Sequence, residues 1–127
     1  MFPILFAALI ATTAHAEDAR VAKLRAWTKA GLVTDVREDP PAQGTDETRA
    51  NIFVSPKFVL LPEKRQAEIA TTVCSLTVDT QEHVTTCALW RGTLAIGTID
   101  DEGTLEWLPW YIAEVRRREF ARAPAPK

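Results

Sequence analysis

The hydrophobic pattern at the start of the chain, after an apolar leader, has the spacing of a helix. Val21, Leu24 and Trp27 recur at steps of three, which predicts one amphipathic helix. Asp18 stands where an N-cap residue is expected, and Gly31 supplies the left-handed residue that ends many helices. The pattern therefore predicts a first helix that begins at Asp18 and ends at Gly31.

The next segment is polar and contains two short apolar runs. Residues 33–36 are able to form a short edge strand, whereas the prolines and glycine within 40–44 exclude regular structure in the connection that follows. Residues 51–54 (NIFV) predict a second short strand, which ends at Ser55-Pro56.

A second helix is expected to begin near Pro62, because proline is favoured in the first turn of a helix. Ile69, Val73 and Leu76 continue it at helical spacing. From Ser75 onward the spacing becomes alternating, so the helix is expected to give way to strands there.

The second half of the chain predicts a meander of three strands, with turns at 79–82, 91–92 and 100–103, and residues 104–107 are able to close the sheet. Pro109 then opens a final helix, predicted over 110–121. Its expected inner stripe consists of Leu108, Tyr111, Ile112 and Val115.

These elements predict the α+β class: a small antiparallel β-meander of three to five strands, with two or three helices packed on one face. The length suits one compact domain, assigned to residues 17–121, and residues 122–127 are expected to form a flexible tail.

The first 16 residues, MFPILFAALIATTAHA, predict a cleaved secretory signal peptide. They combine an apolar run with a small-residue A-x-A site at Ala14-His15-Ala16, and the run is too short to span a bilayer. No Lys or Arg precedes the run, so a retained membrane anchor is the alternative. Cleavage after Ala16 would place the protein in the periplasm or outside the cell.

Composition excludes some functions. With 46% hydrophobic residues, 25% charged residues and a formal net charge of −2, the chain resembles an ordinary globular protein and not a nucleic-acid-binding one.

The only two cysteines, Cys74 and Cys87, are expected to form a disulfide, because export places both thiols in an oxidising compartment. Two geometries remain open. In one, the cysteines face each other across a hairpin, with Leu76 opposite Thr85. In the other, Cys74 lies in the last turn of the second helix and joins that helix to the strand that carries Cys87.

Catalytic, cofactor and metal sites have little support. The C-x12-C spacing fits neither a compact zinc module nor a C-x-x-C redox pair, and no glycine-rich phosphate motif is present. The three consecutive acids of GTIDDEGT fit a turn better than a calcium loop. No catalytic, cofactor-binding or metal-binding residue is therefore assigned, and no cofactor is expected. An enzyme would depend on His83, Glu68 or Glu114. No G-x-S-x-G or S-x-x-K setting surrounds Ser55 or Ser75, and nothing in the spacing selects the two glutamates as an acid/base pair.

The C-terminal segment carries the clearest surface signal, because aromatic residues precede a cluster of arginines. One interpretation is a partner surface made of Trp107, Trp110, Arg116, Arg117, Arg118 and Phe120. Such a helix would meet an acidic partner or a membrane surface. The other interpretation places the aromatic side chains in the core and the arginines in solvent.

The preferred function is therefore a small exported, disulfide-stapled interaction or accessory protein that binds a protein or envelope component through its surface. The alternative is a small secreted hydrolase that uses dispersed acidic residues.

Overall fold

The computed structural model describes residues 18–39 and 48–122, apart from the side chains of residues 119, 120 and 122. The predicted leader (1–16) and the end of the predicted tail (123–127) lie outside these residues. Within the described part, four helices and five strands follow the order α2–β1–β2–α3–α4–β3–β4–β5–α5. The α+β class expected from the sequence is confirmed.

The five strands form one sheet in the order β1-β2-β3-β4-β5. Their bounds are β1 Val33–Glu38, β2 Thr48–Val54, β3 Val84–Arg91, β4 Leu94–Ile99 and β5 Leu105–Trp107. The pairs β1–β2, β3–β4 and β4–β5 are antiparallel. The last two predicted strands of the meander and the closing strand are present as β3–β5, whereas the first predicted strand, at 76–78, is helical. The β2–β3 pair is parallel, which the sequence analysis did not foresee. A parallel pair needs a crossover connection, and α3 and α4 supply it.

Helix α2 (Ala19–Lys29) matches the first predicted helix. The Asp18 side chain accepts a hydrogen bond from the Arg20 amide, as an N-cap residue does. At the other end, Gly31 has a φ of 76°, and the Leu32 amide donates to the Trp27 carbonyl. Both predicted ends of this helix are therefore confirmed, within a residue or two.

Helix α3 (Pro56–Val59) is a single turn that the sequence analysis missed. The Ser55 side chain caps it by accepting from the Phe58 amide at 3.3 Å, and Pro56 stands in its first turn. Its apolar residues Phe58 and Val59 are buried. The Ser55-Pro56 signal was taken as the end of a strand, but it is also the start of this turn.

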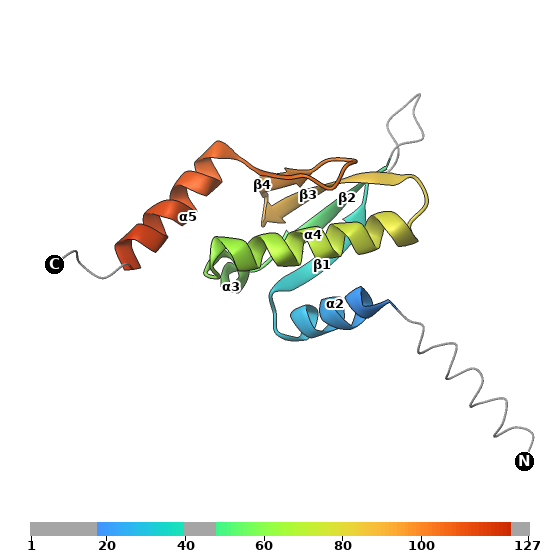
Figure 1. The fold of residues 1–127 in the computed structure, drawn as a ribbon, viewed down its shortest axis with the longest axis horizontal. Coiled ribbons are helices and arrows are strands. Elements are labelled where there is room, and N and C mark those ends of the chain that lie inside the picture. Colours follow the sequence, from blue (N-terminus) through green and yellow to red (C-terminus); the bar gives the residue numbers. More distant parts are fainter. Residues whose placement is uncertain (1–17, 40–47, 123–127) are drawn as a thin grey trace, which may run out of the picture.

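Helix α4 (Glu63–Thr80) is longer than expected and runs along one face of the sheet (Figure 1). The prediction that strand structure begins after Ser75 is wrong. Leu76 and Thr77 are buried one turn beyond Val73, so burial favours continuation of the helix. The hydroxyl groups of Thr71, Thr77 and Thr80 donate to carbonyls four residues earlier, with Thr77 donating to Val73 at 2.8 Å.

This longer helix decides the disulfide geometry. Cys74 lies within α4 and Cys87 in β3, and the two are bonded with their Cα atoms 6.0 Å apart. The predicted disulfide is confirmed and joins a helix to a strand. The hairpin register, with Leu76 opposite Thr85, is wrong, because Leu76 is helical and β3 begins only at Val84.

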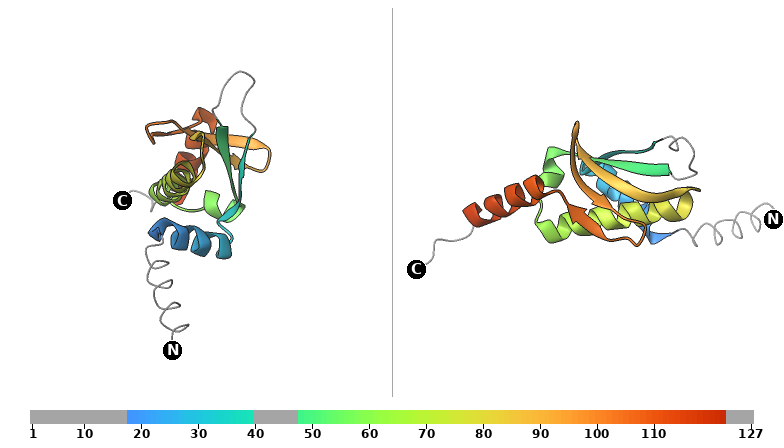
Figure 2. Two further views of the ribbon diagram at one scale, coloured as in Figure 1. Left: turned by 90° about the vertical axis from the view of Figure 1, so that its right-hand side faces the viewer. Right: turned by 90° about the horizontal axis from the view of Figure 1, so that it is seen from above.

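The hydrophobic core lies between the sheet and the helices α2 and α4, which cover the same face in both views of Figure 2. Ala50, Ile52 and Val54 point into it from β2, at alternate positions. Gly97 of β4 leaves room for Trp107, since a Cβ there would lie 2.9 Å from the Trp107 Cε3 atom. Trp107 in turn packs beside the first turn of α5 (Pro109–Arg122), which projects beyond the end of the sheet (Figure 1).

Candidate interaction surface on the C-terminal helix

Helix α5 is anchored to the rest of the domain by two buried side chains, those of Tyr111 and Val115. Pro109 opens the helix, as predicted, and the Tyr111 amide donates to the Leu108 carbonyl at 2.9 Å. The Tyr111 ring lies 5.2 Å from the Trp107 ring, between their centroids. One side of α5 therefore faces inward.

A buried hydrogen-bond network strengthens this attachment. The Tyr111 hydroxyl donates to Gln66 Oε1 at 2.6 Å. The Gln66 amide nitrogen donates to the carbonyls of Val59 at 3.1 Å and Leu61 at 2.7 Å. Both Gln66 and Tyr111 are fully buried. Burial raises the pKa of the Tyr111 hydroxyl to about 12, since the charged phenolate would be poorly solvated there.

Arg118 belongs to the inner side of α5, although the sequence analysis assigned it to the partner surface. Its Nη1 atom donates to the Val59 carbonyl at 3.0 Å. Its Nη2 atom lies 3.6 Å from Glu114 Oε1, and Arg91 Nη1 approaches the same oxygen at 3.9 Å. Arg118 therefore joins α5 to the end of α3 through one hydrogen bond, while its Nε and Nη2 atoms are buried without a hydrogen-bond partner among the described residues.

The outward face of α5 consists of Trp110, Ala113, Arg116 and Arg117. All four are exposed, and Trp110 retains 41% of its accessible surface. At 100° per residue they lie on the side of the helix away from Tyr111. Of the residues predicted for the partner surface, Trp110, Arg116 and Arg117 thus share one exposed face. Trp107 is partly buried against the core, and the Phe120 side chain lies outside the described residues.

Charge is distributed unevenly between this helix and the rest of the chain. Residues 109–127 contain five basic and two acidic residues, whereas residues 1–108 contain ten basic and fifteen acidic ones. The C-terminal segment is therefore positive on a chain that is otherwise negative. An acidic ligand would be attracted to α5 and repelled by much of the remaining surface.

A second surface feature is a cavity of about 460 Å³ between α4 and the β4–β5 turn. Its lining combines hydroxyl groups of α4 with the acids of the turn: Thr71, Thr72, Cys74, Ser75, Val78, Asp79, Thr85, Ile99, Asp100, Asp101, Glu102 and Gly103. Asp100 Oδ1 accepts from the amides of Glu102 at 3.0 Å and Thr104 at 2.8 Å. As expected, these acids belong to a turn between strands. The described residues contain no group of three or more His, Cys, Asp or Glu side chains able to hold a metal ion.

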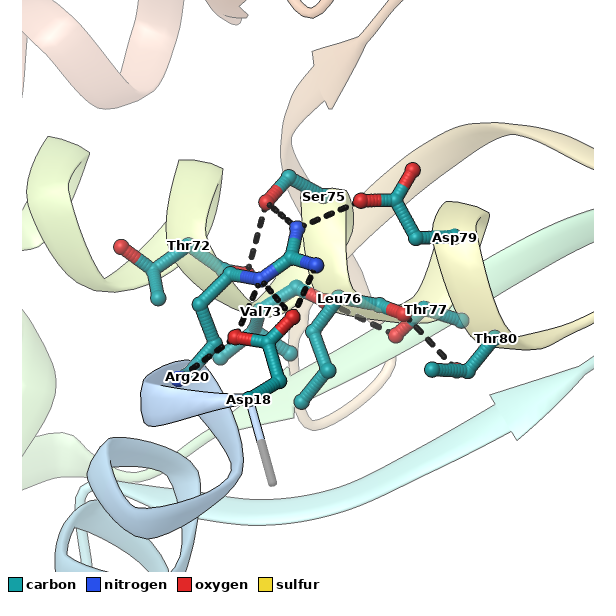
Figure 3. Close-up of polar contacts among 9 residues, drawn as sticks. All are labelled: Asp18, Arg20, Thr72, Val73, Ser75, Leu76, Thr77, Asp79 and Thr80. Carbon is teal, nitrogen blue, oxygen red and sulfur yellow. Dashed lines mark hydrogen bonds and ion pairs between the residues drawn. The ribbon is translucent and has the colours of Figure 1, made fainter. Parts of the chain in front are cut away.

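At the edge of this cavity, Arg20 ties α2 to α4 (Figure 3). Its Nη1 atom donates to Ser75 Oγ at 2.6 Å and lies 2.7 Å from Asp79 Oδ2, while its other nitrogens engage Asp18. The side-chain hydrogen bonds from Arg20 lower the pKa of Asp18 to about 2, and the same contacts raise the pKa of Arg20. These polar groups are hydrogen-bonded and ion-paired to one another, so their role is to hold α2 against α4.

The candidate residues for a hydrolase lie on different elements. Glu68 is exposed on α4 and pairs with Arg65, and Glu114 lies on α5 beside two arginines. His83 is exposed in the turn between α4 and β3, where its φ of 71° serves the change of direction. None of the three lines the cavity beside the β4–β5 turn. The structure therefore does not bring these three residues together, and the hydrolase alternative stays a prediction.

Sequence reasoning missed three residues that shape the α5 region. Gln66 was not singled out, because a polar residue in a charged first turn reads as solvent-exposed. Arg91 was taken for part of a turn, yet its guanidinium lies 5.8 Å from the centre of the Trp110 ring. Leu94 follows the same turn and is 50% exposed. Leu94 fits the alternation of apolar residues in its strand, so the sequence gives no indication that its side chain is exposed.

Comparisons of the chain with protein-family models, with curated proteins and with solved structures find no match. Within residues 18–39 and 48–122, no helix combines the length and apolar character needed to cross a membrane.

Proposed function

We propose that this protein is a small exported interaction or accessory protein, which binds a protein or envelope component through the outward face of α5. Its core is stapled by the Cys74–Cys87 disulfide. Export is supported by the apolar leader with its A-x-A site, and by a disulfide, which persists in oxidising compartments.

The observation that carries the proposal is an exposed tryptophan beside two exposed arginines on a projecting helix. Tryptophan and arginine are enriched among the residues that contribute most to protein–protein binding. A helix held by one side only, as α5 is by Tyr111 and Val115, leaves its other side open to a partner.

The test is affinity capture of the tagged chain from the native envelope fraction, with two variants run in parallel. One variant combines Trp110→Ala, Arg116→Glu and Arg117→Glu. The control variant, Lys23→Glu with Lys64→Glu, makes the same change in charge at exposed positions of α2 and α4. A stoichiometric partner that is retained by the control and lost by the α5 variant supports the proposal.

The opposite result would be a partner that both variants retain, or no partner together with hydrolase activity of the purified chain. Sequencing of the N-terminus of the purified protein tests export separately. Cleavage after Ala16 is expected, whereas an intact N-terminus in the cytoplasm contradicts that part of the proposal.

A further inference from the structure

The β3–β4 hairpin extends the outward face of α5. Leu94 is paired with Arg91 across this hairpin, so their side chains lie on the same face of the sheet. The Arg91 guanidinium in turn lies over the Trp110 ring at 5.8 Å. Arg91 therefore has Leu94 as its strand neighbour and Trp110 beside its guanidinium, and both are among the most exposed large apolar side chains of the described residues.

Trp110 is held in position before any partner arrives. Its ring meets the Tyr111 ring edge to face, at 5.6 Å between centroids, and the Arg91 guanidinium covers another side. Arg91 itself is drawn toward Glu114, whose Oε1 atom lies 3.9 Å away. A restrained aromatic side chain loses little conformational freedom on binding, so it is well suited to anchor a partner.

The arginines near Trp110 differ in whether they form ion pairs within the protein. Arg91 and Arg118 both approach Glu114. Arg116 and Arg117, in contrast, have no ion pair with any side chain that the structure describes. Their charges are available to carboxylates of a partner, and the excess of acidic residues in 1–108 disfavours contact elsewhere.

We propose that the outward face of α5, together with Leu94, binds an acidic segment of a partner protein that presents one large apolar side chain. This inference rests on the proposed function and names the chemistry of the partner. The apolar side chain packs on the exposed surface of Trp110 and Leu94, which lie on either side of Arg91, and the carboxylates of the segment pair with Arg116 and Arg117.

A membrane surface fits this face less well. A helix that lies in a bilayer interface needs a continuous apolar face. Among the described side chains, the outward face of α5 offers one large apolar residue, Trp110, beside Ala113 and two arginines. One aromatic anchor with charged neighbours is the composition of a protein-binding site.

The test is selection from a library of short random peptides displayed on phage, with the full chain and its disulfide intact as bait. We expect the selected peptides to carry a negative net charge and at least one large apolar residue. Neutral or basic peptides, or a selection that yields no binder, would overturn the inference.

Variants then locate the binding site. Charge reversal at Arg116 and Arg117 should abolish binding of a selected peptide, and Trp110→Ala or Leu94→Ser should each weaken it by about tenfold. The control pair Lys23→Glu and Lys64→Glu should leave affinity within about twofold. Binding that survives the charge reversal, or that falls equally in the control, contradicts the proposed site. Circular dichroism of each variant shows that a loss of binding is not a loss of folding.

Vesicles distinguish the membrane alternative. Mixed phosphatidylglycerol and phosphatidylcholine vesicles are sedimented with the full chain, and the inference expects the protein to remain in the supernatant. Sedimentation that depends on Arg116 and Arg117 would overturn it in favour of a lipid surface. A partner captured through α5 that lacks acidic character would also overturn this inference, while the proposed function would stand. A partner that is captured independently of α5 would contradict both the proposed function and this inference.

Discussion

The centre of the domain and its C-terminal helix are held by different interactions. Where α4 crosses β3, Val73, Cys74, Cys87 and Leu89 are all buried, and a covalent bond joins the two elements. Helix α5 depends instead on two buried side chains and on hydrogen bonds that meet at Gln66. The first arrangement is apolar and covalent, whereas the second combines apolar contacts with hydrogen bonds and has no covalent link.

This difference assigns separate roles to the two regions. Changes at the centre should act on the free energy of unfolding of the whole domain, because the core is shared by the sheet and α4. Changes on the outward face of α5 should alter binding and leave the fold intact, because these side chains are exposed. Gln66 links the two regions, since it lies on α4 and holds α5.

The largest expected effect is loss of the disulfide. Replacing Cys74 and Cys87 together by alanine should lower the free energy of unfolding by about 3 kcal/mol, because the unfolded chain is no longer constrained by the closed loop. Urea denaturation measures this change, and reduction of the unaltered protein with dithiothreitol is the control. A loss well below 1 kcal/mol would show that packing alone secures α4 against β3.

The next effect concerns Gln66. Replacement by leucine should cost about 2 kcal/mol, because it leaves the Leu61 carbonyl and the buried Tyr111 hydroxyl without their partner and removes one of the two donors to the Val59 carbonyl. Leucine at the exposed position Gln81 makes the same chemical change without burial and should cost less than about 0.5 kcal/mol. Equal effects in urea denaturation would mean that the network does not support α5.

Tyr111 offers a pH-dependent test of the same attachment, and it is the single tyrosine of the chain. Its pKa should be about 12 in the folded protein, against 10.0 for an ordinary tyrosine. Because folding raises this pKa, the stabilising contribution is complete below pH 10 and is lost as the pH rises toward 12. Ultraviolet absorbance of the phenolate follows the titration directly.

The Tyr111→Phe variant supplies the control for this titration, because it should show no phenolate signal at all. The free energy of unfolding of this variant should not show the decrease that the unaltered protein shows above pH 10. Titration of Tyr111 at its ordinary pKa in a folded protein would contradict the burial on which the inner side of α5 depends.

The smallest effect on stability is expected on the outward face of α5. Arg116→Glu with Arg117→Glu should change the free energy of unfolding by less than about 0.5 kcal/mol, since both side chains are exposed. Urea denaturation measures this beside the binding experiments described above. A large loss of stability would mean that these arginines support the fold, and the contrast between the two regions would disappear.

Much of the fold can be predicted from local patterns. The ends of α2 depend on Asp18 and Gly31, whose roles are set by backbone geometry within a few residues. The strands β3 and β4 alternate clearly, and the disulfide follows from the number of cysteines and the expected export. Such features need no knowledge of distant segments, which is why sequence reasoning found them.

The errors arise where a distant partner outweighs a local preference. Threonine and valine near the end of α4 favour strands by propensity, yet packing of Leu76 and Thr77 keeps them helical. The same extension makes the connection long enough for β3 to lie parallel to β2. Leu76 lies at helical spacing from Val73, but that spacing competes with the alternation that follows, and no pattern within the segment reveals the parallel pairing.

For the candidate surface, the sequence by itself determined that aromatic and basic residues gather on the final helix, because that is a matter of composition and spacing. Only the tertiary structure decided which of them face outward. Arg118 turns inward because the end of α3 offers the Val59 carbonyl, and Trp107 packs inward because Gly97 leaves space for it. Trp110 stays exposed beside Arg91, a residue nineteen positions earlier that only the fold brings to it.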